Sequence, residues 1–326
     1  MNSIAIVIPY FGKLPEHYKY WKQSVYKNES IDFFIITDEK QITSKNNLEV
    51  INMSFQEYVQ KIQEAIPFKI KCDSPYKLCD YKPTIGKVWH DMLADYDFWG
   101  FCDMDLIFGD IRHFITEEIL NTNEKIFTTA HFSLYRNSEK MNCLFLNNGD
   151  YPEYNAEEAF STNEACYFDE FRGMELKCIR NQVSVYHNTK IFLDIEPSKF
   201  DFKNRDGQKV YLIWKEGKLS ALNRDSIEEL LYVHFQKRHM ICEEGEINQK
   251  CFIMQPNFFD NTVSRSIIND GNRMKIYAYQ VKYYINRISK NLKDYSICGM
   301  LRRKRRMKEI DSYRKKLVFN KSGFLN

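Results

Sequence analysis

The chain has 326 residues, of which 44% are hydrophobic and 28% charged, which suffices for one large domain or for one domain with an appendage. Nine scattered cysteines without repeated CxxC pairs argue against a disulfide framework or a structural zinc site. No apolar stretch is long enough to span a bilayer, and the first residues lack the basic start and cleavage site of a signal peptide.

Apolar runs and capping signals in the first hundred residues alternate between strands and helices. Ser54 followed by Glu57 forms a capping box, and Pro83 suits the first turn of a helix. This order predicts an α/β fold with a doubly wound, mostly parallel central sheet and helices on both faces. The predicted strands are residues 4–8, 32–38, 48–53 and 98–102, and the predicted helices are 14–26, 54–66 and 83–94, with a polar loop over 72–81.

The second half of the chain is less regular. Its pattern predicts a strand within 124–129, an interrupted helix over 155–175, a hairpin of 210–214 with 219–222, a helix over 226–231 and a strand over 232–235.

The charge is distributed unevenly along the chain. Residues 273–326 hold 16 lysines and arginines against 3 acidic residues, a net charge of +13, which leaves −10 for the rest. This contrast predicts a mildly acidic domain over 1–270 and a basic helical tail over 271–326. Basic helices with interleaved tyrosines lie on anionic membrane surfaces, although a solubilising charge run and nucleic-acid binding are alternatives. The acidic body and the absence of a nucleic-acid motif favour the membrane and exclude nucleic acid as the expected partner.

Asp103 and Asp105 follow directly after the predicted strand 98–102. Carboxyl ends of strands face the ligand crevice of an open α/β sheet, and residues i and i+2 of an extended chain point the same way. Two such carboxylates suit Mg²⁺ or Mn²⁺ that carries a substrate diphosphate. The alternative is a strand end with two solvated carboxylates.

Two further loops precede or follow predicted elements at the same edge. Asp38 ends the second strand beside Pro9, Tyr10 and Phe11, where an aromatic ring and a carboxylate could recognise a nucleotide base. An ordinary turn aspartate is the alternative. A second group, Lys77, Asp80 and Lys82, precedes a helix start and suits a diphosphate, unless it belongs to a solvated loop.

Two candidates come from the second half. Asp169 and Glu170 lie among aromatic residues, where a carboxyl group gains a raised pKa and can act as a general base; an exposed acidic helix face is the alternative. His234 lies between apolar residues, as core histidines do, but with Asp103 and Asp105 it is a candidate third metal ligand, and Lys237 a phosphate partner.

The ordered set of motifs over about residues 1–260 resembles glycosyltransferases of the GT-A fold, and in particular small bacterial enzymes of capsule and O-antigen synthesis. The resemblance implies that Asp105 binds a divalent metal, that Asp103 touches the metal or the ribose, that Asp38 lies against the base and that His234 completes the metal shell. Asp169-Glu170 resembles the motif that supplies the base in inverting members. In those enzymes the order of the two residues is Glu-Asp, whereas this chain has Asp169-Glu170. Which of the two carboxylates is the base, and whether the reaction inverts the configuration of the sugar, therefore stay open.

The expected protein is therefore a Mn²⁺- or Mg²⁺-dependent glycosyltransferase that uses a nucleotide sugar, with a UDP-sugar favoured. Its acceptor would be an oligosaccharide or a polyprenyl-diphosphate-linked glycan at the inner face of the cell membrane, on the cytoplasmic side. A haloacid-dehalogenase-like phosphatase is disfavoured because in that family the Asp-x-Asp motif follows the first strand, whereas Asp103 and Asp105 follow a later one. A nucleotidyltransferase is disfavoured because no glycine-rich phosphate loop follows the first strand. A non-catalytic carbohydrate-binding protein is the alternative from another class.

Overall fold

The structure is a computed structural model that describes residues 1–149, 152–195, 201–223, 226–236, 238, 240–242, 247, 249–255, 258–260, 281, 285 and 297–320. Its first half contains β1 (Ile4–Pro9), α1 (Tyr18–Tyr26), β2 (Asp32–Thr37), β3 (Leu48–Asn52), α2 (Phe55–Ala65), the 3₁₀ helix η1 (Pro75–Thr84), α3 (Ile85–Val88), α4 (His90–Leu93), β4 (Phe98–Cys102), β5 (Leu106–Phe108), α5 (Ile111–Phe114), α6 (Glu117–Thr122), β6 (Lys125–Ile126), β7 (Phe132–Arg136), α7 (Glu139–Asn142) and η2 (Leu144–Leu146).

The second half contains α8 (Ala156–Phe160), α9 (Met174–Arg180), β8 (Val185–Tyr186), η3 (Thr189–Ile191), β9 (Phe192–Asp194), β10 (Tyr211–Lys215), β11 (Lys218–Leu222), β12 (Ile227–Leu230), β13 (Tyr232–His234), β14 (Ile241–Cys242), β15 (Cys251–Gln255), β16 (Phe258–Asp260) and α11 (Ile297–Asn320).

The central sheet runs in the order β3-β2-β1-β4-β7-β6-β8. The first four strands are parallel, so their carboxyl ends lie at one edge. β7 then pairs antiparallel with β4 and with β6. The predicted mixed α/β fold with a largely parallel central sheet is confirmed, and the antiparallel strand β7 is an addition that the sequence pattern did not reveal.

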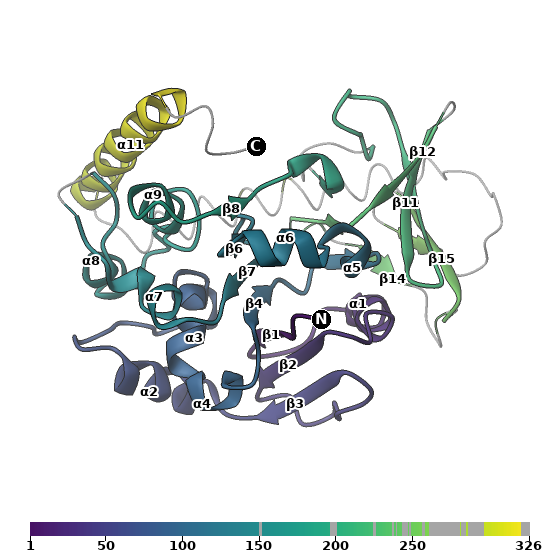
Figure 1. Cartoon of the computed structure of the whole chain (residues 1–326), viewed down its shortest axis with the longest axis horizontal. Coiled ribbons are helices and arrows are strands. Elements are labelled where there is room, and N and C mark those ends of the chain that lie inside the picture. The colour runs from purple at the N-terminus through teal and green to yellow at the C-terminus, as the bar shows by residue number, and fades with distance from the viewer. Residues whose placement is uncertain are drawn as a thin grey trace.

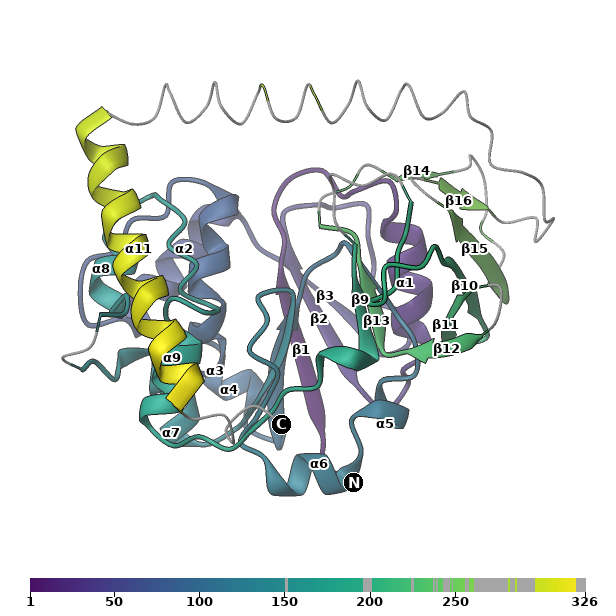
Figure 2. The same ribbon diagram turned by 90° about the horizontal axis from the view of Figure 1, so that it is seen from above.

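Alternate residues of β1 supply two separate cores. Ile4, Ile6 and Ile8 pack on one face of the sheet, and Ala5 and Val7 pack on the other. The helices α2, α3, α8 and α9 cover the face of Ala5 and Val7, whereas α1 and the strands β9–β16 cover the other face (Figure 2). Helices therefore lie on both faces of the sheet, as predicted, but on the second face α1 shares the cover with β-structure that the prediction did not include.

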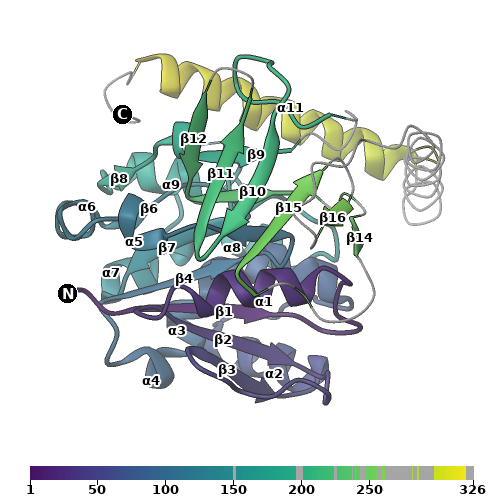
Figure 3. The same cartoon turned by 90° about the vertical axis from the view of Figure 1, so that its right-hand side faces the viewer.

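The covering β-structure on that second face consists of a small sheet, β5-β13-β9, and a larger one in the order β12-β11-β10-β15-β16-β14. The strands of the larger sheet are labelled in Figure 3. The hairpin β10–β11 confirms the sequence prediction, and its turn places Glu216 and Gly217 at φ 50° and 92°. The helix predicted over 226–231 is wrong, because β12 instead pairs antiparallel with β11.

The helix α11 lies against α8 and α9, far from the second sheet (Figure 1). Its Ile310 is fully buried in the core on that side of the sheet. No helix of the described residues is long and apolar enough to cross a membrane. The predicted boundary near residue 270 and the tail tyrosines Tyr277, Tyr279, Tyr283 and Tyr284 lie outside the described residues.

Candidate functional site

The loops at the carboxyl ends of β1, β2 and β4 form the floor of the candidate site. Because the three strands are parallel and adjacent, the residues that follow them meet at one edge. Asp38 accepts a hydrogen bond at 2.8 Å from the backbone N–H of Gly12, so the ends of β1 and β2 are tied together. Asp38 thus lies beside the first loop, where the sequence pattern placed it.

Strand register brings His234 to Asp105. β13 pairs antiparallel with β5 so that His234 lies opposite Leu106, and the N–H of Phe235 donates to the Asp105 carbonyl at 2.9 Å. The Nε2 of His234 is 3.4 Å from Oδ1 of Asp105. One ligand atom each of Asp103, Asp105 and His234 lies within 4.8 Å of the others. Two carboxylates and one imidazole form a donor set that suits Mn²⁺ or Mg²⁺.

Asp194 is a site residue that the sequence analysis missed. β9 pairs parallel with β13 and sets Asp194 opposite His234, whose Nδ1 is 2.8 Å from Oδ1 of Asp194. Burial opposes a charge on His234, but Asp105 and Asp194 outweigh it and raise the pKa of His234 to about 10. The imidazole is therefore protonated in this structure, and a metal ion held by Nε2 would replace the proton there. Asp194 would then keep the proton on Nδ1 and so fix the tautomer that presents Nε2 to the metal.

His131 stacks on His234, with ring centroids 4.3 Å apart and planes 24° from parallel. His131, Asp194 and His234 also lie close enough to form a second candidate cation cluster. Imidazole lone pairs lie in the ring plane, so two nearly parallel stacked rings cannot both direct one at a single ion. Burial and, next, the neighbouring His234 lower the pKa of His131 to about 3, which keeps it neutral. The arrangement therefore favours the set of Asp103, Asp105 and His234.

Lys82 connects this cation cluster to the acidic pair. Its Nζ donates to Oδ1 of Asp103 at 2.6 Å and to the carbonyl of Ala130 at 2.7 Å, and it lies 3.9 Å from Oδ2 of Asp169. Burial disfavours the ammonium charge, but the carboxylates of Asp103 and Asp169 outweigh burial and raise the pKa of Lys82. Lys82 is a fixed positive charge between two groups of carboxylates.

Asp169 and Glu170 lie in the turn before α9. Gly173 closes that turn, since a Cβ at this position would lie 2.3 Å from the carbonyl oxygen of Phe168. Asp169 is 2% exposed and its Oδ2 accepts no hydrogen bond within the described part of the chain. Burial raises the pKa of Asp169 well above its usual range, and burial also raises the pKa of Glu170 to about 7, both against the opposing charge of Lys82. These are the properties expected of a proton acceptor.

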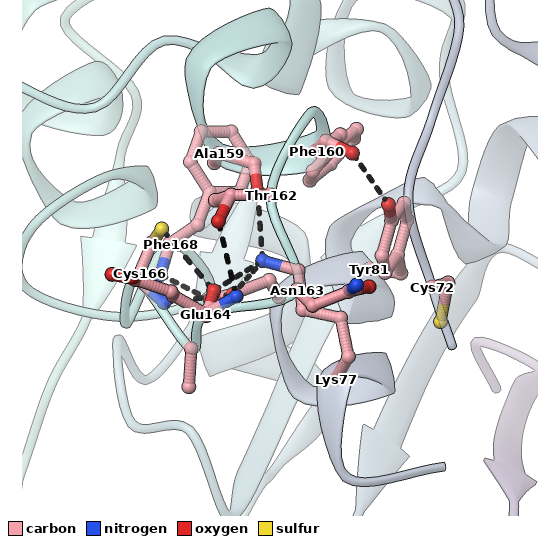
Figure 4. A network of polar contacts seen from close by, with 12 residues as sticks. Cys72, Lys77, Tyr81, Ala159, Phe160, Thr162, Asn163, Glu164, Cys166 and Phe168 are labelled. Atoms are coloured by element: carbon pink, nitrogen blue, oxygen red, sulfur yellow. Dashed lines mark hydrogen bonds and ion pairs between the residues drawn. The ribbon is translucent and has the colours of Figure 1, made fainter. Parts of the chain in front are cut away.

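Lys77 and Asp80 serve the backbone of the segment that leads to Asp169. The ammonium of Lys77 donates to Asp80 at 2.7 Å and to the carbonyls of Ala159 and Glu164 at 2.7 and 2.6 Å, which uses all three of its donors. Asp80 accepts from the backbone N–H groups of residues 166 and 168. Figure 4 shows Lys77 below this segment, with the Tyr81 hydroxyl bonded to the Phe160 carbonyl. No donor of Lys77 remains for a diphosphate, so the structure corrects its expected role and that of Asp80.

The sequence predicted a phosphate-binding helix start here, but the structure forms the 3₁₀ helix η1, which contains Pro83. Of the three polar residues of this segment, Lys82 alone reaches the cluster of Asp103. Lys77 and Asp80 are buried against a segment about 80 residues later, whose backbone carbonyls accept from Lys77 and whose backbone N–H groups donate to Asp80.

The aromatic residues after β1 separate into two environments. Phe11 is 8% exposed and packs on Phe55 and Tyr58, with ring centroids 5.5 and 5.4 Å away, so it belongs to the core. Burial and, next, the charge of Asp105 raise the pKa of Tyr10, and this tyrosine is partly exposed. Pro9 is the last residue of β1 and is partly exposed. Of the predicted base-stacking residues, Tyr10 therefore remains the better placed. Lys237 lies outside the described residues.

Comparison with known proteins identifies a family and a set of similar solved structures. The model of a family of unknown function, DUF6625, matches residues 6–262. No curated protein matches the chain. Two crystal structures of the glycosyltransferase GlyE from Streptococcus pneumoniae TIGR4, the second in its apo form, are 11% and 13% identical, each with a TM-score of 0.27 over 43% of this chain. The matched region spans 36% and 35% of GlyE, little more than a third of its length. Since the family model covers more than half of the chain, the protein belongs to the DUF6625 family.

Proposed function

We propose that this protein is a metal-dependent glycosyltransferase of the GT-A kind, which transfers a sugar from a nucleoside-diphosphate sugar, with UDP-sugar favoured, to a hydroxyl group of an acceptor. The observation that carries the proposal is the position of Lys82, which bonds Asp103 in the cation cluster and lies 3.9 Å from Asp169 in the acidic pair. A diphosphate leaving group and an attacking hydroxyl need these two environments side by side.

The donor set fits Mn²⁺ or Mg²⁺. Asp103 and Asp105 are partly exposed, and the second oxygen of Asp103 has no partner among the described residues. Asp103, Asp105 and His234 would hold the ion, and Asp194 would orient His234. A bound divalent cation supplies positive charge that stabilises the departing diphosphate. Lys82 holds Asp103 in place through its hydrogen bond to that carboxylate. It would also add a second positive charge beside the oxygen atoms of the departing diphosphate.

The acidic pair supplies the proton acceptor. In this proposal the carboxylate of Asp169 or Glu170 takes the proton of the acceptor hydroxyl as the bond to the sugar forms. Both groups have raised pKa values because of burial, so both candidates remain open. Tyr10 and Asp38, at the ends of β1 and β2, would contact the nucleotide base.

The first experiment is a thermal-shift screen of UDP, GDP and CMP, each with and without Mn²⁺, followed by NMR detection of donor turnover. Stabilisation by one nucleotide only when metal is present, with release of that nucleotide from its sugar donor, is the expected result. A protein that no nucleotide stabilises, or that hydrolyses simple phosphate monoesters instead, would contradict the proposal and favour a binding protein or a phosphatase.

The expected acceptor is a polyprenyl-diphosphate-linked glycan at the inner face of the membrane. Support comes from the solvent-facing side of α11, where Arg302, Lys304, Arg305 and Lys308 are all exposed. Each basic residue near an anionic surface contributes about 1 kcal/mol to binding. Replacing the four with glutamine should abolish sedimentation with phosphatidylserine vesicles, whereas replacing the exposed Lys13, Lys40, Lys69 and Lys71 should not. Equal binding by both variants would refute membrane attachment through α11.

A further inference from the structure

The helix α11 lies outside residues 6–262, yet its polar contacts with the body concentrate on one segment. Arg303 is 3.2 Å from Glu164, Arg306 binds both oxygens of Glu158 at 3.2 Å, and Arg314 binds both oxygens of Glu175 at 2.5 and 3.1 Å. All these partners fall between residues 153 and 175, the stretch that carries Asp169 and Glu170.

Two ion pairs of α11 lie within a few residues of the acidic pair, on its C-terminal side. Arg172 donates from Nε and Nη2 to the two carboxylate oxygens of Asp311, at 3.0 and 3.1 Å. Glu175, which is 4% exposed, accepts two hydrogen bonds from the guanidinium group of Arg314. Arg314 lies one turn after Asp311, on the same face of α11. Paired planar contacts of this kind fix orientation as well as distance. The two pairs hold the chain two residues after Glu170 and at the start of α9.

Apolar and aromatic packing supports the same attachment. The guanidinium groups of Arg172 and Arg314 lie 4.7 and 5.4 Å from the ring centroid of Phe171, so two cations contact the residue that follows Glu170. Ile310, which directly precedes Asp311 in α11, has no exposed surface and belongs to the same core as Phe168. The turn is thus held by α11 from outside and by Lys77 and Asp80 from inside.

We propose that α11 is a positioning element for the acidic pair: through Asp311 and Arg314 it fixes the turn of Asp169 and Glu170 in the geometry that acceptor activation requires. The helix itself contacts no reacting atom. For its catalytic consequence this inference rests on the proposed function, but the fixed turn is a property of the protein alone and can be measured without turnover.

The test compares the double variant Asp311→Asn/Arg314→Gln with Arg306→Gln. Arg306→Gln is the control because it removes a bidentate ion pair from the face of α11 that packs on the body, while the partner of Arg306, Glu158, lies in α8 and not in the turn of the acidic pair. In the double variant, residues 167–175 should exchange amide hydrogens faster, and kcat should fall by about 10²-fold while the donor KM changes by less than about twofold. Arg306→Gln should leave the exchange of residues 167–175 and kcat as in the parent protein.

A charge swap separates positioning from general loosening. Arg172→Asp combined with Asp311→Arg should restore slow exchange and most of kcat relative to Arg172→Asp alone. Unchanged exchange of residues 167–175 in the double variant, or an equal effect of Arg306→Gln, would overturn the inference. If no nucleotide sugar is turned over by any variant, the proposed function fails, and the exchange data still decide whether α11 fixes the turn.

Discussion

The two halves of the candidate site use the same type of side chain in opposite environments. Asp103 and Asp105 are partly exposed where strands end, so that solvent and the neighbouring cationic side chains Lys82 and His234 stabilise their negative charge. Asp169 is buried and Glu170 is partly exposed, and desolvation raises the pKa of both. Environment can thus assign two pairs of carboxylates to two kinds of chemistry, cation binding and proton transfer. Lys82 contacts both halves.

The halves also differ in what holds them. The cation cluster depends on strand register, which sets His234 beside Asp105 and Asp194. The acidic pair lies in a turn held by side chains from distant parts of the chain: Lys77 and Asp80 in η1, and Asp311 and Arg314 in α11. Substitutions in these supports should therefore affect the two halves separately.

The largest effect is expected for Lys77→Met, which leaves Asp80 buried without its cation. Removing one partner of a buried ion pair costs about 3–5 kcal/mol, and the backbone donors to Asp80 favour the lower end of that range. Urea unfolding measures this loss. The matched change Lys71→Met, at an exposed lysine, should alter the free energy of unfolding by less than about 0.5 kcal/mol. Equal stabilities of the two variants would contradict a supporting role for Lys77.

Asp105→Asn should break the cation half without loosening the acidic half. The substitution keeps the shape of the side chain and removes its charge. Loss of a residue that only orients a metal ligand lowers metal affinity by about 10- to 100-fold, so loss of the charged ligand Asp105 should lower Mn²⁺ affinity by more than that. Calorimetric titration with Mn²⁺ measures this change. Asp95→Asn, at an exposed aspartate, is the control and should bind metal as the parent does. Undiminished Mn²⁺ binding by Asp105→Asn would remove this residue from the metal site.

A smaller effect is expected for Asp194→Ala, which leaves the three ligands intact. Without the carboxylate 2.8 Å from Nδ1, His234 can turn or change tautomer, and Mn²⁺ affinity should fall by about 10- to 100-fold. The same titration measures it, with Asp194→Asn as an intermediate that keeps an acceptor oxygen but no charge. If Asp194→Ala binds Mn²⁺ as tightly as the parent, the hydrogen bond has no role in ligand orientation.

Local signals predicted much of the fold. The capping box of Ser54 and Glu57 forms at the start of α2, and the buried run 98–102 is β4. The strand β12 was missed because Glu228, Glu229 and Leu230 favour a helix in isolation, and only pairing with β11 makes them extended. A single sequence carries no direct sign of that partner.

The sequence pattern located the carboxylates of the site but not their supports. Asp194 ends a short apolar run, as Asp38 and Asp103 do, and this shared pattern could have identified it. The buried position of Lys77 had no such signal. Its partners are backbone carbonyls of residues 159 and 164, and carbonyl groups occur at every position of a chain.

The last prediction concerns the pH dependence of the base itself, which can separate the two acids. Burial raises the pKa of Glu170 to about 7, and only its ionised form can accept a proton. If Glu170 is the base, kcat/KM should rise about tenfold per pH unit below about pH 7 and become constant above it. Glu170→Gln should then abolish this rise together with most of the activity. If the rise persists in Glu170→Gln and is lost in Asp169→Asn, the buried Asp169 is the base. A profile that keeps the rise in both variants would show that neither carboxylate accepts the proton, and the assignment of proton transfer to the buried half would fail.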